Sequence, residues 1–159
     1  MKIYLASDHA GFELKALLAP HLAELGHEVE DLGPFAKVED DDYPDFISKA
    51  AQQISEHPNN KAIVIGGSGQ GEAIVANRFP KVRAAVFYGG ASDILTLSRE
   101  HNDANVLSLG ARFMSEVEAK EAVKKWLETP FSGEEHHSRR IAKIEQYPPR
   151  SNTAPVSEW

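Results

Sequence analysis

A short apolar run, Ala62–Ile65, is followed at once by the glycine-rich segment Gly66–Glu72 and then by an amphipathic stretch, Ala73–Asn77. This order predicts a buried strand, a tight loop and a helix. Such a loop points backbone N–H groups at the space above the helix N-terminus, which therefore favours anions. Glu72 is the unusual member of the segment. Its carboxylate would repel a bound phosphate, so it needs a function of its own.

The loop does not match the two common nucleotide-binding patterns. Gly66 and Gly71 have the spacing of a P-loop, but Glu72 and Ala73 stand where that motif needs a lysine and a hydroxyl residue. Aligned as a dinucleotide loop, the segment has Glu72 or Ile74 at the last glycine position, which disfavours a nucleotide-dependent oxidoreductase. What remains is a cradle of amides with a carboxylate at its rim. That pairing suits removal of a proton from carbon and stabilisation of the resulting oxyanion.

Composition narrows the class of protein further. The 159 residues fit one domain, which we place at 1–146, with an extended tail over 147–159. A net charge of −7 argues against a nucleic-acid partner, and the absence of cysteine excludes thiolate metal sites and a cysteine nucleophile. The chain shows no signal-peptide pattern and no apolar run of the roughly 18 residues that a membrane span needs. We expect a cytoplasmic enzyme with no membrane partner.

Strand and helix signals alternate along the chain. Strands are predicted over 2–6, 27–32, 61–66, 83–88 and 104–109, and helices over 10–25, 44–57, 71–79, 91–101, 115–128 and 134–146. Gly26 is expected to end the first helix and Pro44 to open the second. The alternation predicts an α/β fold: a Rossmann-like three-layer sandwich with a five-stranded parallel sheet, helices on both faces and a further C-terminal helix.

Ligands of such sheets bind at the carboxyl ends of the strands. Four polar or glycine-rich segments follow the predicted strands, namely Ser7–Gly11, Gly66–Glu72, Tyr88–Gly90 and Gly110–Arg112. We therefore expect these segments, although far apart in the chain, to meet at one edge of the sheet.

The first candidates at this edge also have purely structural interpretations. Asp8 could cap the first turn of the following helix, and His9 alone could be an ordinary loop histidine. Glu72 suits the first turn of a helix, where the helix dipole favours an acidic side chain by roughly 0.3–1 kcal/mol and lowers its pKa. Burial in a closed pocket would raise that pKa instead. The sequence leaves this balance open.

Two further polar clusters lie outside these loops. His101 and Asn102 end a predicted helix, which suits the helix dipole, but a histidine there can also carry a proton near neutral pH. His136 and Arg140 lie four residues apart and share one helix face, which suits either a phosphate or a solvated surface paired with nearby glutamates. His136 and His137 are adjacent, so their side chains are expected to point in different directions. No metal site is predicted.

Taken together, these segments resemble the ribose-5-phosphate isomerase B family, which includes galactose-6-phosphate isomerase subunits and allose-phosphate isomerases. The resemblance rests on an ordered set of motifs that extends to about residue 146: Ser7–Gly11, Asp42–Pro44, Gly66–Glu72, Ala76–Asn77, Arg99–Asn102, Asn105–Val106 and Gly110–Arg112. It implies an aldose–ketose isomerase that uses no metal or other cofactor and works through a cis-enediolate.

The resemblance also implies catalytic roles. Glu72 would move the proton between C1 and C2 of the sugar. Ser68 and the loop amides would stabilise the enediolate oxygen, with substrate contacts from Gly67, Gly69, Gln70 and Gly71. His101, together with Asp8, would open the furanose ring.

Contacts to the rest of the substrate follow in the same way. The resemblance places Asn102 and Tyr43 along the sugar and His9, Arg112 and Arg140 at the phosphate. His136 stands where relatives commonly carry a phosphate-binding arginine, so phosphate affinity could be weaker or more pH-dependent in this chain. In this family the C-terminal helix reaches into the neighbouring subunit's site. The resemblance thus implies a homodimer with shared sites, and leaves a dimer of dimers open.

The family uses two kinds of base, a cysteine at the position of Gly66 or a glutamate at the position of Glu72, and this chain matches the glutamate branch. We predict an isomerase of ribose 5-phosphate and ribulose 5-phosphate. An isomerase of a hexose 6-phosphate, of allose or galactose type, stays an alternative because Tyr88–Ser92 is slightly longer than in relatives. The other alternative is a non-catalytic phospho-sugar binding module, although a pure anion binder gains nothing from Glu72.

Overall fold

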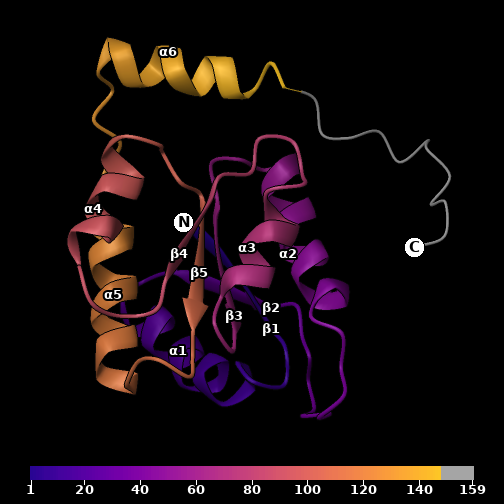
Figure 1. Cartoon of the computed structure of the whole chain (residues 1–159). Coiled ribbons are helices and arrows are strands. Elements are labelled where there is room, and N and C mark those ends of the chain that lie inside the picture. Colours follow the sequence, from indigo (N-terminus) through magenta and orange to yellow (C-terminus); the bar gives the residue numbers. More distant parts are fainter. Residues whose placement is uncertain (148–159) are drawn as a thin grey trace, which may run out of the picture.

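The computed structural model describes residues 1–147 and contains one parallel sheet with the strand order β2-β1-β3-β5-β4 (Figure 1). The strands are β1 (Lys2–Ser7), β2 (Glu28–Asp31), β3 (Lys61–Gly66), β4 (Ala84–Phe87) and β5 (Val106–Gly110). The helices are α1 (Phe12–Glu24), α2 (Pro44–Glu56), α3 (Gln70–Ala76), α4 (Asp93–Glu100), α5 (Glu116–Glu128) and α6 (Glu135–Ile144). Every predicted element is confirmed, with ends that shift by a few residues. The predicted tail lies outside the described residues except for Tyr147, so the domain limits stay a prediction.

The sheet is buried on both faces because successive strand residues enter two different apolar cores. Ile3 and Leu5 of β1 pack with residues of α1, α4 and α5, whereas Tyr4 and Ala6 pack with residues of α2 and α3. Burial on both faces is the usual environment of an all-parallel sheet. The two cores produce the three layers that the sequence predicts, with α1, α4 and α5 on one face and α2 and α3 on the other (Figure 1).

Helix ends follow the local sequence signals. Gly26 has φ +84° directly after α1, and its N–H donates to the Ala23 carbonyl at 2.9 Å while the His27 N–H donates to that of Leu22 at 3.2 Å. This is a Schellman motif, and it confirms that Gly26 ends the helix. Pro44 is the first residue of α2, as predicted.

The connections out of β1 and β3 place a crevice at the carboxyl ends of these two strands. The chain leaves β1 through α1 on one face and leaves β3 through α3 on the other face. Neighbouring strands whose helices diverge in this way form a topological switch point, where ligands of open α/β sheets bind. The segments that start at Asp8 and Gly67 both begin there.

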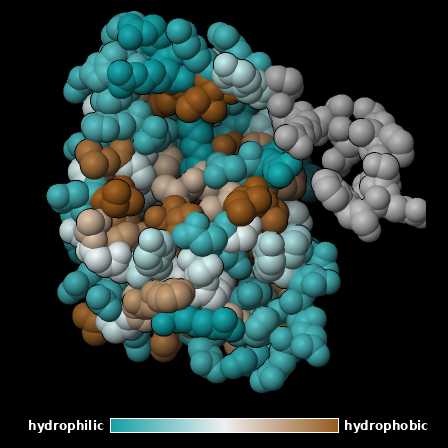
Figure 2. All heavy atoms as spheres, viewed as in Figure 1, coloured by the Kyte–Doolittle hydropathy of each residue, from teal (hydrophilic) through white to brown (hydrophobic). Residues whose placement is uncertain are grey.

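Helix α6 stands apart from these layers. It lies across the amino ends of the strands (Figure 1), whereas the crevice lies at their carboxyl ends. Viewed from the same side, hydrophobic side chains line a hollow beneath it (Figure 2). His137 is the only buried residue of α6, while Ile144 is 49% exposed and Tyr147, just beyond the helix, is 81% exposed. No helix within residues 1–147 has the length and apolar character needed to cross a lipid bilayer.

Candidate active site

A pocket of about 360 Å³ opens at the switch point. It is lined by Asp8, His9, Ala10, Tyr43, Gly67, Ser68, Gly71, Glu72, Arg112 and Phe113. Most of the predicted site residues are in this set, and Gly69 and Gln70 belong to the same loop. The expectation that segments after β1, β3 and β5 meet at one edge is therefore confirmed.

Glu72 is the buried carboxylate of the pocket, with only 4% of the residue exposed. Burial raises the pKa of its carboxyl group; a hydrogen bond from its own backbone N–H opposes this, and the nearby charge of Asp8 raises the pKa further. The sequence leaves open whether burial or the helix terminus decides the pKa of Glu72, and in the structure the effect of burial is the larger one. A carboxyl group shifted in this direction is a stronger proton acceptor when ionised.

Gly66 makes room for that carboxylate. A Cβ atom added at Gly66 would lie 1.9 Å from Glu72 Oε1 and 2.1 Å from its Cδ, so the side chain of Glu72 fills the space that any larger residue at position 66 would occupy. Position 66 therefore needs glycine, because the Glu72 carboxylate leaves no room for a Cβ atom there.

The glycine loop forms the second wall. Gly69 has φ +76° and precedes α3, and its carbonyl accepts a hydrogen bond of 2.6 Å from Ser108, a fully buried residue of β5. Within residues 1–147 the N–H groups of Gly67 and Ser68 have no backbone or side-chain acceptor. The loop thus presents free amides beside a carboxylate, the cradle that the sequence predicts.

A positive cluster marks the mouth of the pocket. The backbone N–H of His9 donates to Asp41 Oδ1 at 3.0 Å, and His9 Nδ1 lies 2.7 Å from the same oxygen. The hydrogen bond to Asp41 raises the pKa of His9; Asp8 also raises it, whereas the charge of Arg112 lowers it. The guanidinium of Arg112 lies against Gly67, 3.2 Å from where a Cβ would stand. The His9 imidazole and the Arg112 guanidinium therefore line one region of the pocket, which suits a phosphate.

Asp8 has the capping role and also lines the pocket, whereas its part in ring opening stays a prediction. Its Oδ1 accepts a hydrogen bond of 3.0 Å from the Gly11 N–H at the start of α1, which is the capping role, and the same residue lines the pocket near Glu72. Tyr43 also lines the pocket, and its ring lies 2.8 Å from where a Cβ of Gly71 would stand.

Sequence reasoning missed Phe113, which lines the pocket, and Asp41, which holds the pocket residue His9. Asp41 is a member of the acidic run before Tyr43, and that run was the only available signal. Phe113 follows Arg112 and packs edge-on against Tyr88, with ring centroids 6.0 Å apart. The two rings form an aromatic rim on the side of the β4–α4 loop.

Four predicted site residues lie elsewhere in this chain. His101 and Asn102 follow α4, and His136 and Arg140 belong to α6, at the amino ends of the strands. Arg83, just before β4, fixes this region: its Nε donates to the Asn102 carbonyl at 2.9 Å, and its Nη1 contacts Glu145 Oε1 at 2.8 Å. One chain therefore does not bring these four residues to the pocket.

Histidine rings cluster at this second edge. The rings of His101 and His137 are stacked, with centroids 4.2 Å apart, and those of His136 and His137 are 3.9 Å apart. The expectation that His136 and His137 point in different directions is wrong. His137 is buried against His101, and the His136 ring folds over it toward Glu134, whose Oε2 lies 3.4 Å from His136 Nδ1.

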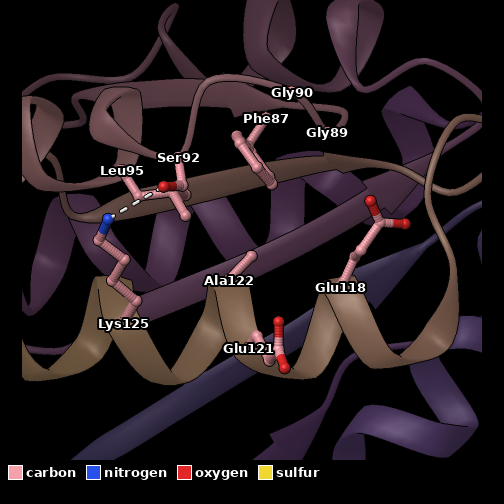
Figure 3. A pocket seen from close by; sticks show the side chains of 9 residues that line it. All are labelled: Phe87, Gly89, Gly90, Ser92, Leu95, Glu118, Glu121, Ala122 and Lys125. Carbon is pink, nitrogen blue, oxygen red and sulfur yellow. Dashed lines mark hydrogen bonds between the residues drawn. The ribbon is translucent and has the colours of Figure 1, made fainter.

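A separate cavity of about 310 Å³ lies between α5 and the β4–α4 loop, lined by Phe87, Gly89, Gly90, Ser92, Leu95, Glu118, Glu121, Ala122 and Lys125 (Figure 3). Lys125 donates to Ser92 Oγ at 3.2 Å across it. No predicted site residue lines this cavity, and Glu118 serves as the capping-box partner of Ser115. The cavity at the switch point is therefore the better candidate for the active site.

The fold and the pocket together define an α/β protein with a buried carboxylate and an amide cradle at the switch point of a parallel sheet. The profile of the Ribose/Galactose Isomerase family matches residues 3–144, and the chain belongs to this family.

Named relatives agree with this assignment along almost the whole chain. The chain is 40% identical over 156 residues to the ribose-5-phosphate isomerase B of Mycolicibacterium paratuberculosis, covering 98% of this chain and 97% of the relative. The structure is similar to that of the Clostridium thermocellum ribose-5-phosphate isomerase B, with a TM-score of 0.86 and 42% identity over 92% of this chain and 96% of that one. It is also similar to the Mycoplasma genitalium enzyme with bound ribulose-5-phosphate, with a TM-score of 0.87 and 37% identity over 92% and 95%.

Proposed function

We propose that the protein interconverts ribose 5-phosphate and ribulose 5-phosphate through a cis-enediolate, with Glu72 as the base. The observation that carries the proposal is the buried carboxylate of Glu72 beside free loop amides at a switch point. The relative from Mycolicibacterium paratuberculosis, 40% identical over 156 residues, is named a ribose-5-phosphate isomerase B. The similar structure from Mycoplasma genitalium holds ribulose-5-phosphate, the ketose product.

Proton transfer follows from the chemistry of the pocket. In the aldose-to-ketose direction, Glu72 takes the proton from C2 and returns it to C1, and the proton of the C2 hydroxyl moves to the C1 oxygen. Between these two proton transfers, negative charge develops on an oxygen of the enediolate. Gly67 and Ser68 line the same pocket, and their N–H groups, which have no acceptor within residues 1–147, would stabilise that charge as an oxyanion hole. No step needs a metal ion.

His9 and Arg112 bind the phosphate at the mouth of the pocket. Asp41 acts through His9 as a positioning residue: its carboxylate holds the Nδ1 side of the ring and raises the pKa of His9, which favours the cationic form of the imidazole. Tyr43 lines the pocket along the sugar part of the substrate.

A second copy of the chain completes the site. His101, Asn102, His136 and Arg140 all lie at the amino edge of their own sheet, so they can act on a substrate only in the pocket of a neighbouring molecule. Helix α6 has the geometry for this, because it stands off the body with exposed apolar side chains such as Ile144. We therefore infer a homodimer with two shared sites; pairing of dimers and a cytoplasmic location stay predictions.

The close approach of Glu72 to Gly66 supports the glutamate branch. In the other branch of the family, the base is a cysteine at the position of Gly66. Here the Glu72 carboxylate lies where the Cβ of such a residue would stand. Glu72 thus delivers a base to the same point in the pocket from a different position in the chain.

An isomerase of a hexose 6-phosphate is the second candidate. A further hollow of about 130 Å³, lined by Ser68, Gln70, Tyr88 and Phe113, adjoins the pocket and shares Ser68 and Phe113 with it. That space could hold an additional carbon with its hydroxyl group.

The deciding experiment compares initial rates of the purified protein on ribose, allose and galactose phosphates, with deuterium incorporation from D₂O measured for each. The proposal expects the highest kcat/KM with ribose 5-phosphate and deuterium exchange at the carbon-bound position. A preference for a hexose phosphate would favour the second candidate. Binding without turnover or exchange would leave only a phospho-sugar binding module.

A further inference from the structure

We propose that Glu134, His136 and His137 form a binding site for a borderline-soft divalent metal ion such as Zn²⁺, at the amino end of α6. Within one chain, the site is separate from the pocket at the switch point. Its existence does not depend on the proposed function, but its effect on catalysis does.

The three residues already bring their donor atoms together. One ligand atom from each lies within 4.8 Å of the others. Bonds of about 2.0–2.1 Å in a tetrahedral zinc site hold ligand atoms about 3.3–3.4 Å apart. Glu134 Oε2 and His136 Nδ1 are 3.4 Å apart and so have this spacing. The side chains of His136 and Glu134 are 41% and 60% exposed, so small rotations can close the remaining distance to His137.

Neighbouring residues hold the donors in a state that suits a metal. His137 is buried and stacked on His101, which fixes the plane of its ring in the way an outer-shell partner does. The stacking therefore holds the buried ring beside the donor atoms of Glu134 and His136.

Ion pairing leaves the correct carboxylate available. Glu135 is bound by Arg139, with Nη1 at 2.9 and 2.7 Å from its two oxygens. The carboxylate of Glu134 contacts only the imidazole of His136 in the described part of the chain. Two imidazoles and one carboxylate are the donor set that zinc and nickel accept, whereas calcium and magnesium require mostly oxygen ligands.

Occupation of this site has a consequence for the proposed enzyme. His136 faces the substrate phosphate of a neighbouring molecule in the proposed dimer. A bound metal ion takes the same imidazole nitrogen, so zinc should inhibit isomerisation reversibly, and a chelator should restore it.

The test titrates the full-length protein with ZnCl₂ by isothermal titration calorimetry at pH 7.5, in a buffer that does not chelate zinc. We expect one zinc per chain with a Kd of about 1–10 μM. His136→Arg should weaken binding by at least about 100-fold while the far-UV circular dichroism stays unchanged, because the side chain is partly exposed. His57→Gln, which changes an exposed histidine at the end of α2, is the matched control and should bind as the wild type does.

Asp41→Asn separates this site from the Asp8–His9–Asp41 group, which could also hold an ion. Loss of zinc binding in Asp41→Asn but not in His136→Arg would overturn the proposal, as would a stoichiometry of zero at 100 μM protein, a concentration about tenfold or more above the expected Kd. Zinc that binds through His136 without inhibiting turnover would leave the metal site standing and contradict the place given to His136 in the proposed enzyme.

Discussion

Asp41 Oδ1 receives two contacts from His9, the backbone N–H at 3.0 Å and ring Nδ1 at 2.7 Å. The other carboxylate oxygen of Asp41 is buried and has no hydrogen-bond partner in the described chain. The carboxylate of Asp41 therefore has His9 as its one hydrogen-bonding partner in the described chain. Such a contact orients the ring and favours its cationic form.

Replacing Asp41 by asparagine should make phosphate binding more sensitive to pH. The carboxylate raises the pKa of His9, so in the wild type the imidazole keeps its charge to a higher pH. Without it, the pKa falls back toward about 6.5 and the charge is lost above that value. KM for ribose 5-phosphate should then match the wild type near pH 6 and rise well above it at pH 8, with kcat little changed. Asp40→Asn is the neighbouring control. Parallel KM–pH curves for wild type and Asp41→Asn would exclude this role.

Glu72→Gln should remove turnover and keep binding. Glutamine preserves the shape of the side chain but cannot accept the proton, and general-base catalysis contributes about 10²–10⁴-fold to a rate. We expect kcat to fall by this factor while Kd for ribulose 5-phosphate, measured by calorimetry, changes little. Because the pKa of Glu72 is raised, the wild-type rate should also decline on acidification before an ordinary glutamate would be protonated. Glu116→Gln on the surface of α5 serves as control, and near-normal kcat in Glu72→Gln would exclude Glu72 as the base.

Gly66→Ala tests the contact between glycine and base directly. The added methyl group would overlap the Glu72 carboxylate, so that side chain must move. Activity should fall to the level of Glu72→Gln, with little loss of thermal stability because the atoms displaced are the end of a side chain. The double variant Gly66→Ala, Glu72→Gln should be no worse than either single one, since residues in contact are not additive. Additive losses would show that Gly66 acts in some other way.

Mixing two impaired variants tests the shared site. Glu72→Gln removes the base from the pocket of its own chain, and Arg140→Ala removes a phosphate contact that the chain supplies to its neighbour. Arg140→Ala alone should raise KM by about tenfold to hundredfold, the cost of losing a charge-assisted hydrogen bond. Co-refolded heterodimers carry one intact site, so an equal mixture should recover roughly a quarter of the wild-type activity measured at low substrate. No recovery above the sum of the separate variants, despite dimers in solution, would place both residues in one chain's site.

The periodicity of the sequence was enough to predict the elements and the loop. Glu72 could be located because the glycine loop follows an apolar strand, and parallel strands carry their loops to one edge. The pKa of Glu72 could not be predicted, because burial and the helix terminus act in opposite directions and only packing decides between them.

Asp41 is 32 residues from His9, in a loop with no periodicity, so nothing in the sequence pairs the two. The separation of His101 and His136 from the pocket follows from helix direction: a helix that returns to start the next parallel strand ends at the opposite edge of the sheet. The contact of His136 with His137 could not be predicted, because helix geometry sets only the direction of each Cβ. The rings converge through packing on His101.

The close approach of Glu72 to Gly66 has an evolutionary consequence. A lineage that exchanged one base for the other would have to pass through an intermediate with either two side chains competing for one volume or none filling it. Both intermediates lose the reaction, so the switch requires coordinated substitutions at two positions six residues apart. Descendants on either side of that barrier should therefore carry one residue or the other, and seldom both.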